Sequence, residues 1–161
     1  MRRWILVLPA VAAIGSCRAK HEASTGKEFF EKMRKAEKDQ DAETLWKMMS
    51  KNTQEALVQR AKSELEGAKG SAEAKENLKK LAGVDPTAMD PLALAKAILK
   101  KRLELEAGRS EKIKLLEEKT EGDKIILVTQ EEGQEREETV LIKEDGFLRA
   151  DFQATAARQF K

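Results

Sequence analysis

The sequence predicts an α+β fold in which N-terminal helices pack on a C-terminal four-stranded antiparallel β-meander. Charged residues make up 37% of the 161 residues and aromatic residues only 4%, with no Tyr, which favours long solvated helices over an all-β barrel. Apolar residues recur at helical spacing over residues 25–107. Over residues 112–152, short apolar runs instead alternate with turn sequences that contain Gly. Residues 25–161 are therefore expected to form one domain.

Five helices are expected before residue 108. Each begins at a side chain whose oxygen can accept a hydrogen bond from the first helical turn, at Thr25, Asp41, Ser50 or Thr53, Ser71 and Asp90. Thr25 and Glu28 together match a capping box, in which both side chains bond amides of the first turn. The charged runs, such as residues 32–38 and 73–80, are expected to be solvated faces with ion pairs one turn apart.

Four strands are expected around residues 113–116, 125–128, 140–142 and 147–152. The connections are short, and Asp145-Gly146 is typical of a two-residue hairpin turn. Such short connections require antiparallel neighbours, so the four strands should form a meander. Residues 154–161 are expected to add a short helical turn.

Residues 1–16 have the composition of a signal peptide. Arg2 and Arg3 give a positive start, an apolar run follows, and Gly15 and Ser16 are small. The apolar run covers about ten residues, short of the roughly 20 that span a bilayer. Residues 17–24 read as a polar tether between this peptide and the domain.

The segment Ile14-Gly15-Ser16-Cys17 resembles the lipobox of bacterial lipoproteins. The resemblance implies cleavage between Ser16 and Cys17, a lipid attached to the Cys17 sulfur, and a protein held on a membrane of the cell envelope through that anchor. In the sorting pattern of enterobacterial lipoproteins, Asp directly after the lipid-bearing Cys retains the protein in the inner membrane. With Arg18 at that position, the resemblance implies the outer membrane. The alternative is an ordinary secreted protein whose single Cys falls at this place by chance.

Two segments of the predicted domain resemble small lipoproteins of the NTF2-like (cystatin-like) superfamily. They are residues 45–50, which follow an aromatic helix, and residues 143–148 in the last hairpin. The resemblance implies a curved sheet with a cone-shaped cavity, a design that serves enzymes, ligand binders and partner-binding modules alike.

Large adaptable side chains concentrate on the first two predicted helices. They are Phe29, Phe30, Met33, Trp46, Met48 and Met49. Such a set either lines a pocket or fills the core under the sheet, and Met suits both roles. Core packing is the simpler interpretation for most of them individually.

Several kinds of chemistry are excluded by composition. One Cys allows no intramolecular disulfide or Cys-based zinc cluster, and one His, His21, allows no multi-His metal centre. No phosphate-binding or nucleotide-binding motif occurs, so neither a cofactor nor a metal is expected. Removal of residues 1–16 leaves 29 basic and 29 acidic residues, a balance that argues against nucleic-acid binding.

Two functions follow as hypotheses. The first is a lipid-anchored, non-enzymatic module that binds an envelope protein or a small apolar ligand. The second is an NTF2-like cavity enzyme that uses a carboxylate base. A large pocket that holds an Asp or Glu with a raised pKa would favour the enzyme, whereas a filled apolar interior would favour the binding module.

Overall fold

The computed structural model describes residues 19–159, except the side chains of residues 87 and 159. The predicted signal peptide, its cleavage site at Ser16 and the predicted lipid-attachment residue Cys17 lie outside the described residues. The elements are α1 (Gly26–Lys38), α2 (Ala42–Met48), α3 (Lys51–Lys69), α4 (Ala72–Ala82), the 3₁₀ turn η1 (Pro86–Ala88), α5 (Pro91–Leu105), η2 (Arg109–Glu111), β1 (Ile113–Glu121), β2 (Lys124–Glu131), β3 (Arg136–Glu144), β4 (Phe147–Ala150) and α6 (Phe152–Gln159). The predicted α+β class is confirmed. No helix of residues 19–159 has the length and apolarity to cross a bilayer.

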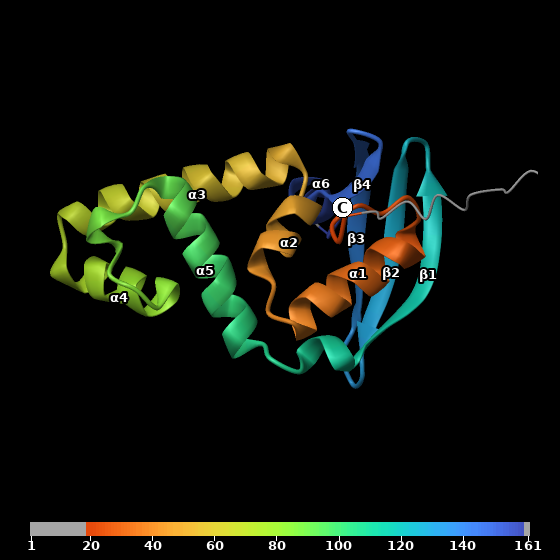
Figure 1. Ribbon diagram of the computed structural model, residues 1–161, viewed down its shortest axis with the longest axis horizontal. Helices are drawn as coiled ribbons and strands as arrows, with labels where there is room; N and C mark the ends of the chain where they lie inside the picture. The colour runs from red at the N-terminus through yellow and green to blue at the C-terminus, as the bar shows by residue number, and fades with distance from the viewer. Residues whose placement is uncertain (1–18, 160–161) are drawn as a thin grey trace, which may run out of the picture.

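The sheet is an antiparallel meander in the order β1-β2-β3-β4, as predicted (Figure 1). Asp145 and Gly146 both have positive φ, 52° and 86°, which is the backbone of a two-residue hairpin whose twist matches the strands. At the β4 edge the chain after α2 joins the sheet, because the Ser50 amide donates to the Ala150 carbonyl at 2.9 Å.

The last strand is shorter than predicted, since β4 ends at Ala150 instead of residue 152. Asp151 ends it by acting as a helix cap: its Oδ1 accepts a hydrogen bond from the Ala154 amide at 2.9 Å. The final helix α6 therefore starts at Phe152, earlier than the helical turn expected at residues 154–161.

Helix α6 covers the outer face of the sheet, opposite α1. Ile126 and Val140, which are fully buried, face α6, while neighbouring strand residues face α1 by the alternation of side chains along a strand. Arg158 fixes the helix by pairing with Glu121 and with Glu138, whose Oε2 lies 2.6 Å from the guanidinium Nε.

The inner face of the sheet is covered by α1. Phe29 and Phe30 pack with Leu127, Leu141 and other buried side chains of the sheet. This contact confirms that an early helix carries an apolar stripe toward the sheet, as the helical spacing of these residues predicts.

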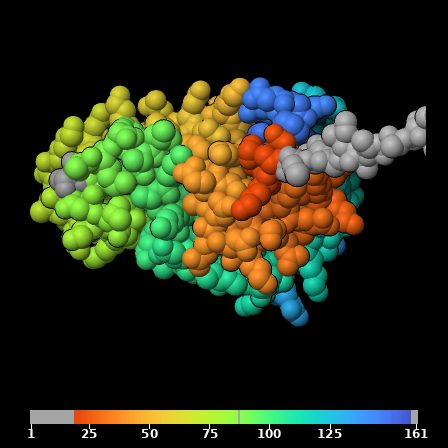
Figure 2. Space-filling model, viewed as in Figure 1, coloured from red at the N-terminus to blue at the C-terminus, as the bar shows by residue number. Residues whose placement is uncertain are grey.

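Helices α3, α4 and α5 do not cover the sheet, which corrects the expectation that all the helices do so. They pack mainly with one another and extend away from it as an arm (Figures 1 and 2). Their apolar stripes close a separate core that includes Trp46, Ala61, Leu78 and Leu94. The helical spacing thus predicts the apolar faces of α3, α4 and α5 correctly, but these faces pack on one another and not on the sheet.

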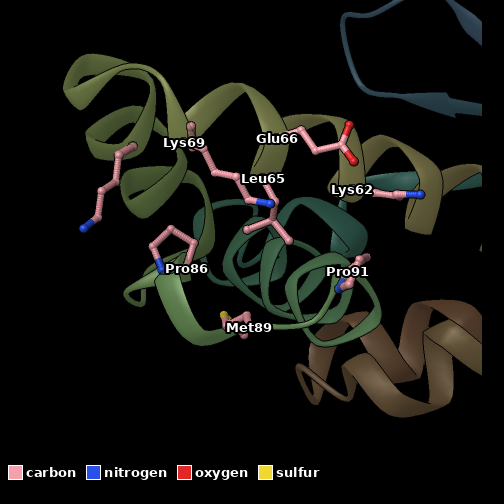
Figure 3. Close-up of a pocket in the computed structure, with 9 residues that line it drawn as sticks. Lys62, Leu65, Glu66, Lys69, Pro86, Met89 and Pro91 are labelled. Carbon is pink, nitrogen blue, oxygen red and sulfur yellow. The ribbon is translucent and has the colours of Figure 1, made fainter.

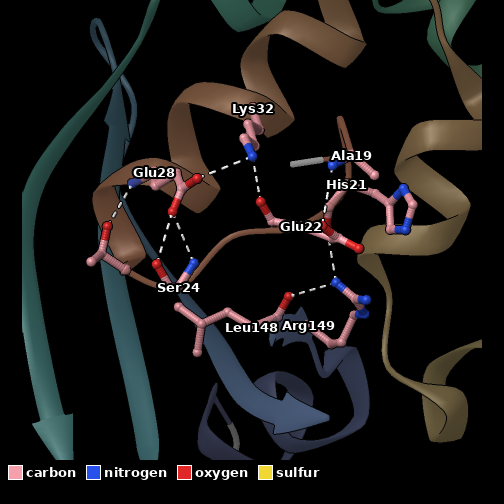
Figure 4. A network of polar contacts seen from close by, with 9 residues as sticks. Ala19, His21, Glu22, Ser24, Glu28, Lys32, Leu148 and Arg149 are labelled. Atoms are coloured by element: carbon pink, nitrogen blue, oxygen red, sulfur yellow. Dashed lines mark hydrogen bonds and ion pairs between the residues drawn. The ribbon is translucent and has the colours of Figure 1, made fainter. Parts of the chain in front are cut away.

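Residues 19–24 belong to the folded domain rather than to a tether (Figure 4). Ala23 is fully buried, and its carbonyl accepts a hydrogen bond from the Leu148 amide at 2.8 Å. The Arg149 guanidinium donates to the carbonyl of His21 at 2.9 Å, and the Lys32 ammonium donates to the carbonyl of Glu22. The predicted tether thus docks between β4 and α1 over these six residues.

One of the two hydrogen bonds of the predicted capping box of α1 forms as expected, and the other goes to the residue before Thr25. Thr25 Oγ1 accepts from the Glu28 amide at 3.2 Å, as predicted. The Glu28 carboxylate, however, accepts from the amide of Ser24 at 2.9 Å and pairs with Lys32 at 3.0 Å. These bonds lower the pKa of Glu28 to about 2, with the Ser24 amide as the largest cause.

The N-terminus of α1 approaches the sheet closely at Gly26. A β-bulge at Leu116 shifts the register of β1. Beyond the bulge, the Glu118 carboxylate accepts hydrogen bonds from the backbone amides of Gly26 at 3.2 Å and Lys27 at 3.0 Å. A Cβ on Gly26 would lie 2.6 Å from Glu118 Cδ and 2.7 Å from Leu127 Cδ2. Only glycine fits this contact without displacement of a neighbour.

Replacement of Gly26 by Ala should therefore lower the free energy of unfolding by about 1–3 kcal/mol, the usual cost of overpacking. Gly67→Ala is the control, because Gly67 lies in α3 with nothing within 4 Å of an added Cβ. The control should raise stability by about 0.5–1 kcal/mol through helix propensity. Urea unfolding measures both, and equal effects of the two changes would contradict the close approach.

Candidate functional site

A cavity of about 310 Å³ lies where α1, α2 and α5 meet the start of α6. Its wall is mainly apolar, and the apolar residues that line it are Phe29, Met33, Leu45, Met48, Met49, Leu99, Leu103, Ala150 and Phe152. Three charged side chains, Glu37, Arg102 and Glu106, also line it. An apolar wall with a few polar groups is typical of small-molecule sites.

Four of the six residues predicted as pocket or core line this cavity: Phe29, Met33, Met48 and Met49. Phe29 and Met48 are each only 1% exposed, so they serve the core and the cavity wall at once. The positions of these residues fit both interpretations left open by the sequence, and binding of a ligand by them stays a prediction.

The other two predicted residues lie away from the cavity. Phe30 is buried in the core under the sheet, with the Arg34 guanidinium 5.5 Å from its ring centroid. Trp46 is buried in the core of the helical arm. Both residues thus contribute to cores outside this cavity, and Phe30 also borders a shallow hollow between α1 and β1.

Glu37 is the cavity residue that the sequence analysis missed. It lies in the charged run 32–38, which was expected to be solvated, yet its side chain is half-buried. The signal was present in the spacing, because Phe29, Met33 and Glu37 follow one another at intervals of four and share one face of α1. Burial raises the pKa of the Glu37 carboxyl, and the nearby Glu106 carboxylate raises it further.

The other charges at the cavity are paired with each other. Arg102 Nε donates to Glu106 Oε1 at 2.8 Å, and Glu106 also lies 3.9 Å from Arg109. Arg109 in turn bonds Glu131 at 2.7 Å. The Glu37 carboxylate, by contrast, makes no hydrogen bond or ion pair within the described part of the chain, although the guanidinium groups of Arg109, Arg34 and Arg102 attract it from a longer distance. The site is therefore an apolar cavity that contains one unpaired carboxyl group.

A second hollow, of about 430 Å³, lies on the helical arm (Figure 3). Figure 3 shows Lys69 extending toward Leu65, with Pro86 and Met89 facing them across the hollow. None of the residues predicted as a site lines it. The cavity beside α1 is for this reason the better candidate.

His21 and clusters of metal-ligating side chains are the other features that could carry chemistry. Within residues 19–159, no group of three or more His, Cys, Asp or Glu side chains is placed to hold a metal ion. His21 lies in the docked N-terminal segment, half-buried, where burial and the nearby Arg149 lower the pKa of its imidazole. His21 does not line the cavity.

Comparison of the chain with protein-family models, curated proteins and solved structures finds no match. The resemblances to bacterial lipoproteins and to NTF2-like proteins therefore stay predictions.

Replacement of Glu37 by Gln should stabilise the protein at neutral pH. Because folding raises the pKa of this carboxyl above its ordinary value of 4.5, ionised Glu37 opposes folding, and stability falls as the pH rises through the folded-state pKa. Gln cannot ionise, so the gain should vanish well below pH 4.5, where the carboxyl is protonated in both states.

Thermal unfolding of the wild type and of Glu37→Gln, measured from well below pH 4.5 to neutral pH, gives the difference in stability between them. Glu31→Gln is the matched control, since Glu31 is an exposed residue of the same helix and should show no such pH-dependent gain. A Glu37→Gln variant that is less stable than the wild type at neutral pH would contradict the burial of an unpaired charge.

Proposed function

We propose that this protein is a lipid-anchored component of the bacterial cell envelope that binds a small, largely apolar molecule without chemical conversion. The observation that carries the proposal is the apolar wall of the cavity, formed by residues such as Phe29, Met33 and Met49. Its volume of about 310 Å³ lies at the small end of the range of ligand sites, about 300–1,000 Å³. A compact ligand fits such a space.

The proposed anchor would hold the domain directly at the bilayer. Cys17 precedes Ala19 by two residues, a length of chain that spans at most about 7 Å. The segment that follows is fixed through Ala23 to β4. Two or three acyl chains at Cys17 would give stable attachment, which a single chain does not. Arg18 supports the outer membrane as the more favoured location.

Replacement of Cys17 by Ser should leave an unprocessed precursor that incorporates no labelled fatty acid, because the thiol that accepts the lipid is removed. The wild-type chain should incorporate the label and begin at Cys17. Intact-mass measurement of both proteins tests this expectation. A mature wild-type protein that begins elsewhere and carries no lipid would contradict it.

Ligand binding can be tested by filling the cavity. Met33 is only partly buried, so Met33→Trp should be accommodated while it occupies cavity volume. We expect the wild-type protein in phosphatidylcholine nanodiscs to bind cyclohexylmethanol by titration calorimetry, and Met33→Trp to lose at least tenfold in affinity. Leu65→Trp, which changes the hollow on the arm, is the control and should bind as the wild type does.

An enzymatic role is the second candidate function, and the raised pKa of Glu37 favours it. A general base in a cavity works best with a pKa near the working pH. Against this, the remaining charged groups of the cavity wall, Arg102 and Glu106, are already paired with each other. Envelope metabolites that the wild type converts and Glu37→Gln does not would support the enzyme, whereas capture of an unchanged molecule would support the binding module.

A further inference from the structure

We propose that the cavity selects small apolar molecules that carry a positively charged amine, which the Glu37 carboxylate holds. This inference rests on the proposed binding function and names the chemical class of its ligand. The expected ligand is a primary amine with a compact apolar body of about six to eight carbon atoms, which suits a site at the small end of the usual range of volumes.

The charges around Glu37 support this class, because every nearby cation is already engaged. On α1, Arg34 donates through Nε to the Ser110 carbonyl at 2.8 Å. On α5, Arg102 is paired with Glu106 at 2.8 Å. The surroundings of Glu37 thus hold guanidinium groups, but each of them has a nearer partner.

The third cation, Arg109 of η2, bonds Glu131 at 2.7 Å and lies 3.5 Å from Glu137. Arg109 is therefore already paired with two carboxylates of the sheet, those of Glu131 and Glu137. Arg109, Arg34 and Arg102 attract the Glu37 carboxylate from a distance, but among the described residues no cation lies within ion-pair distance of it.

Desolvation of this carboxylate is an unfavourable contribution that a ligand can remove. A charge taken out of water without a partner costs free energy, and the Glu106 carboxylate nearby increases that cost. An ammonium group would supply N–H donors and an opposite charge, in a hydrogen bond roughly twice as strong as a neutral one. An anion would be repelled by both carboxylates, and a neutral alcohol could donate one hydrogen bond to Glu37 but would bring no opposite charge.

The apolar residues of the wall are placed to hold the body of such a ligand. Met33 and Phe29 lie on the same face of α1 as Glu37, one and two turns away respectively, and Leu103 of α5 also lines the cavity. An amine at Glu37 would therefore direct its hydrocarbon part along α1 toward the apolar part of the cavity.

The experiment compares three probes of nearly equal shape, namely cyclohexylmethylamine, cyclohexylmethanol and cyclohexanecarboxylate. Each is titrated at mildly alkaline pH into the full chain in zwitterionic phosphatidylcholine nanodiscs, and the heat from empty nanodiscs is subtracted. We expect the amine to bind at least tenfold more tightly than the alcohol, and the carboxylate to bind most weakly.

Variants of Glu37 identify the group responsible. Glu37→Gln should reduce the affinity for the amine about tenfold and abolish the preference for the amine over the alcohol. Glu37→Asp keeps the charge and should keep a preference for the amine. Glu31→Gln, an exposed change on the same helix, should alter nothing. Circular dichroism verifies that each variant is folded.

The outcomes separate the two proposals. Equal affinity for the amine and the alcohol, or a preference for the amine that survives Glu37→Gln, overturns the inference and leaves the binding function intact. Absence of binding by all three probes, or alcohol binding that Met33→Trp does not weaken, overturns the proposed function itself and the inference with it.

Discussion

The contact between α1 and the inner face of the sheet determines the position of the cavity. Gly26 allows the helix to begin against Leu127, and Glu118 holds its first amides. With the start of the helix fixed, Phe29 enters the sheet core, and the next turns carry Met33 and then Glu37 toward α5. The same helix thus supplies both core and cavity wall. Its placement links the stability of the fold to the shape of the site.

Helix α2 connects two regions that each have a core of their own. Met48 belongs to the core under the sheet, Trp46 to the core of the helical arm, and Leu45 to a smaller cluster with Leu103. The cavity lies at this junction, where side chains from separate packing units meet. Unfilled volume at a junction of cores is a natural position for a ligand, because the surrounding elements are each stabilised elsewhere.

Much of the fold could be predicted because caps, periodicity and hairpin turns are local signals, as Thr25 and Asp145-Gly146 illustrate. The partner of an apolar face is not local, so the sequence did not indicate that α3, α4 and α5 would pack with one another. Asp151 was assigned to a strand because its capping role depends on where the strand ends. Glu37 was missed because a carboxylate in a charged run is usually solvated, and only the tertiary structure places α5 over it.

The most direct test of this account is a crystal structure of the protein with cyclohexylmethylamine bound. The account predicts the ring against the apolar wall beside Met33 and the nitrogen at hydrogen-bond distance, about 3 Å, from a Glu37 oxygen. An amine bound at a carboxylate outside the cavity, with the space beside Glu37 empty or closed, would contradict it.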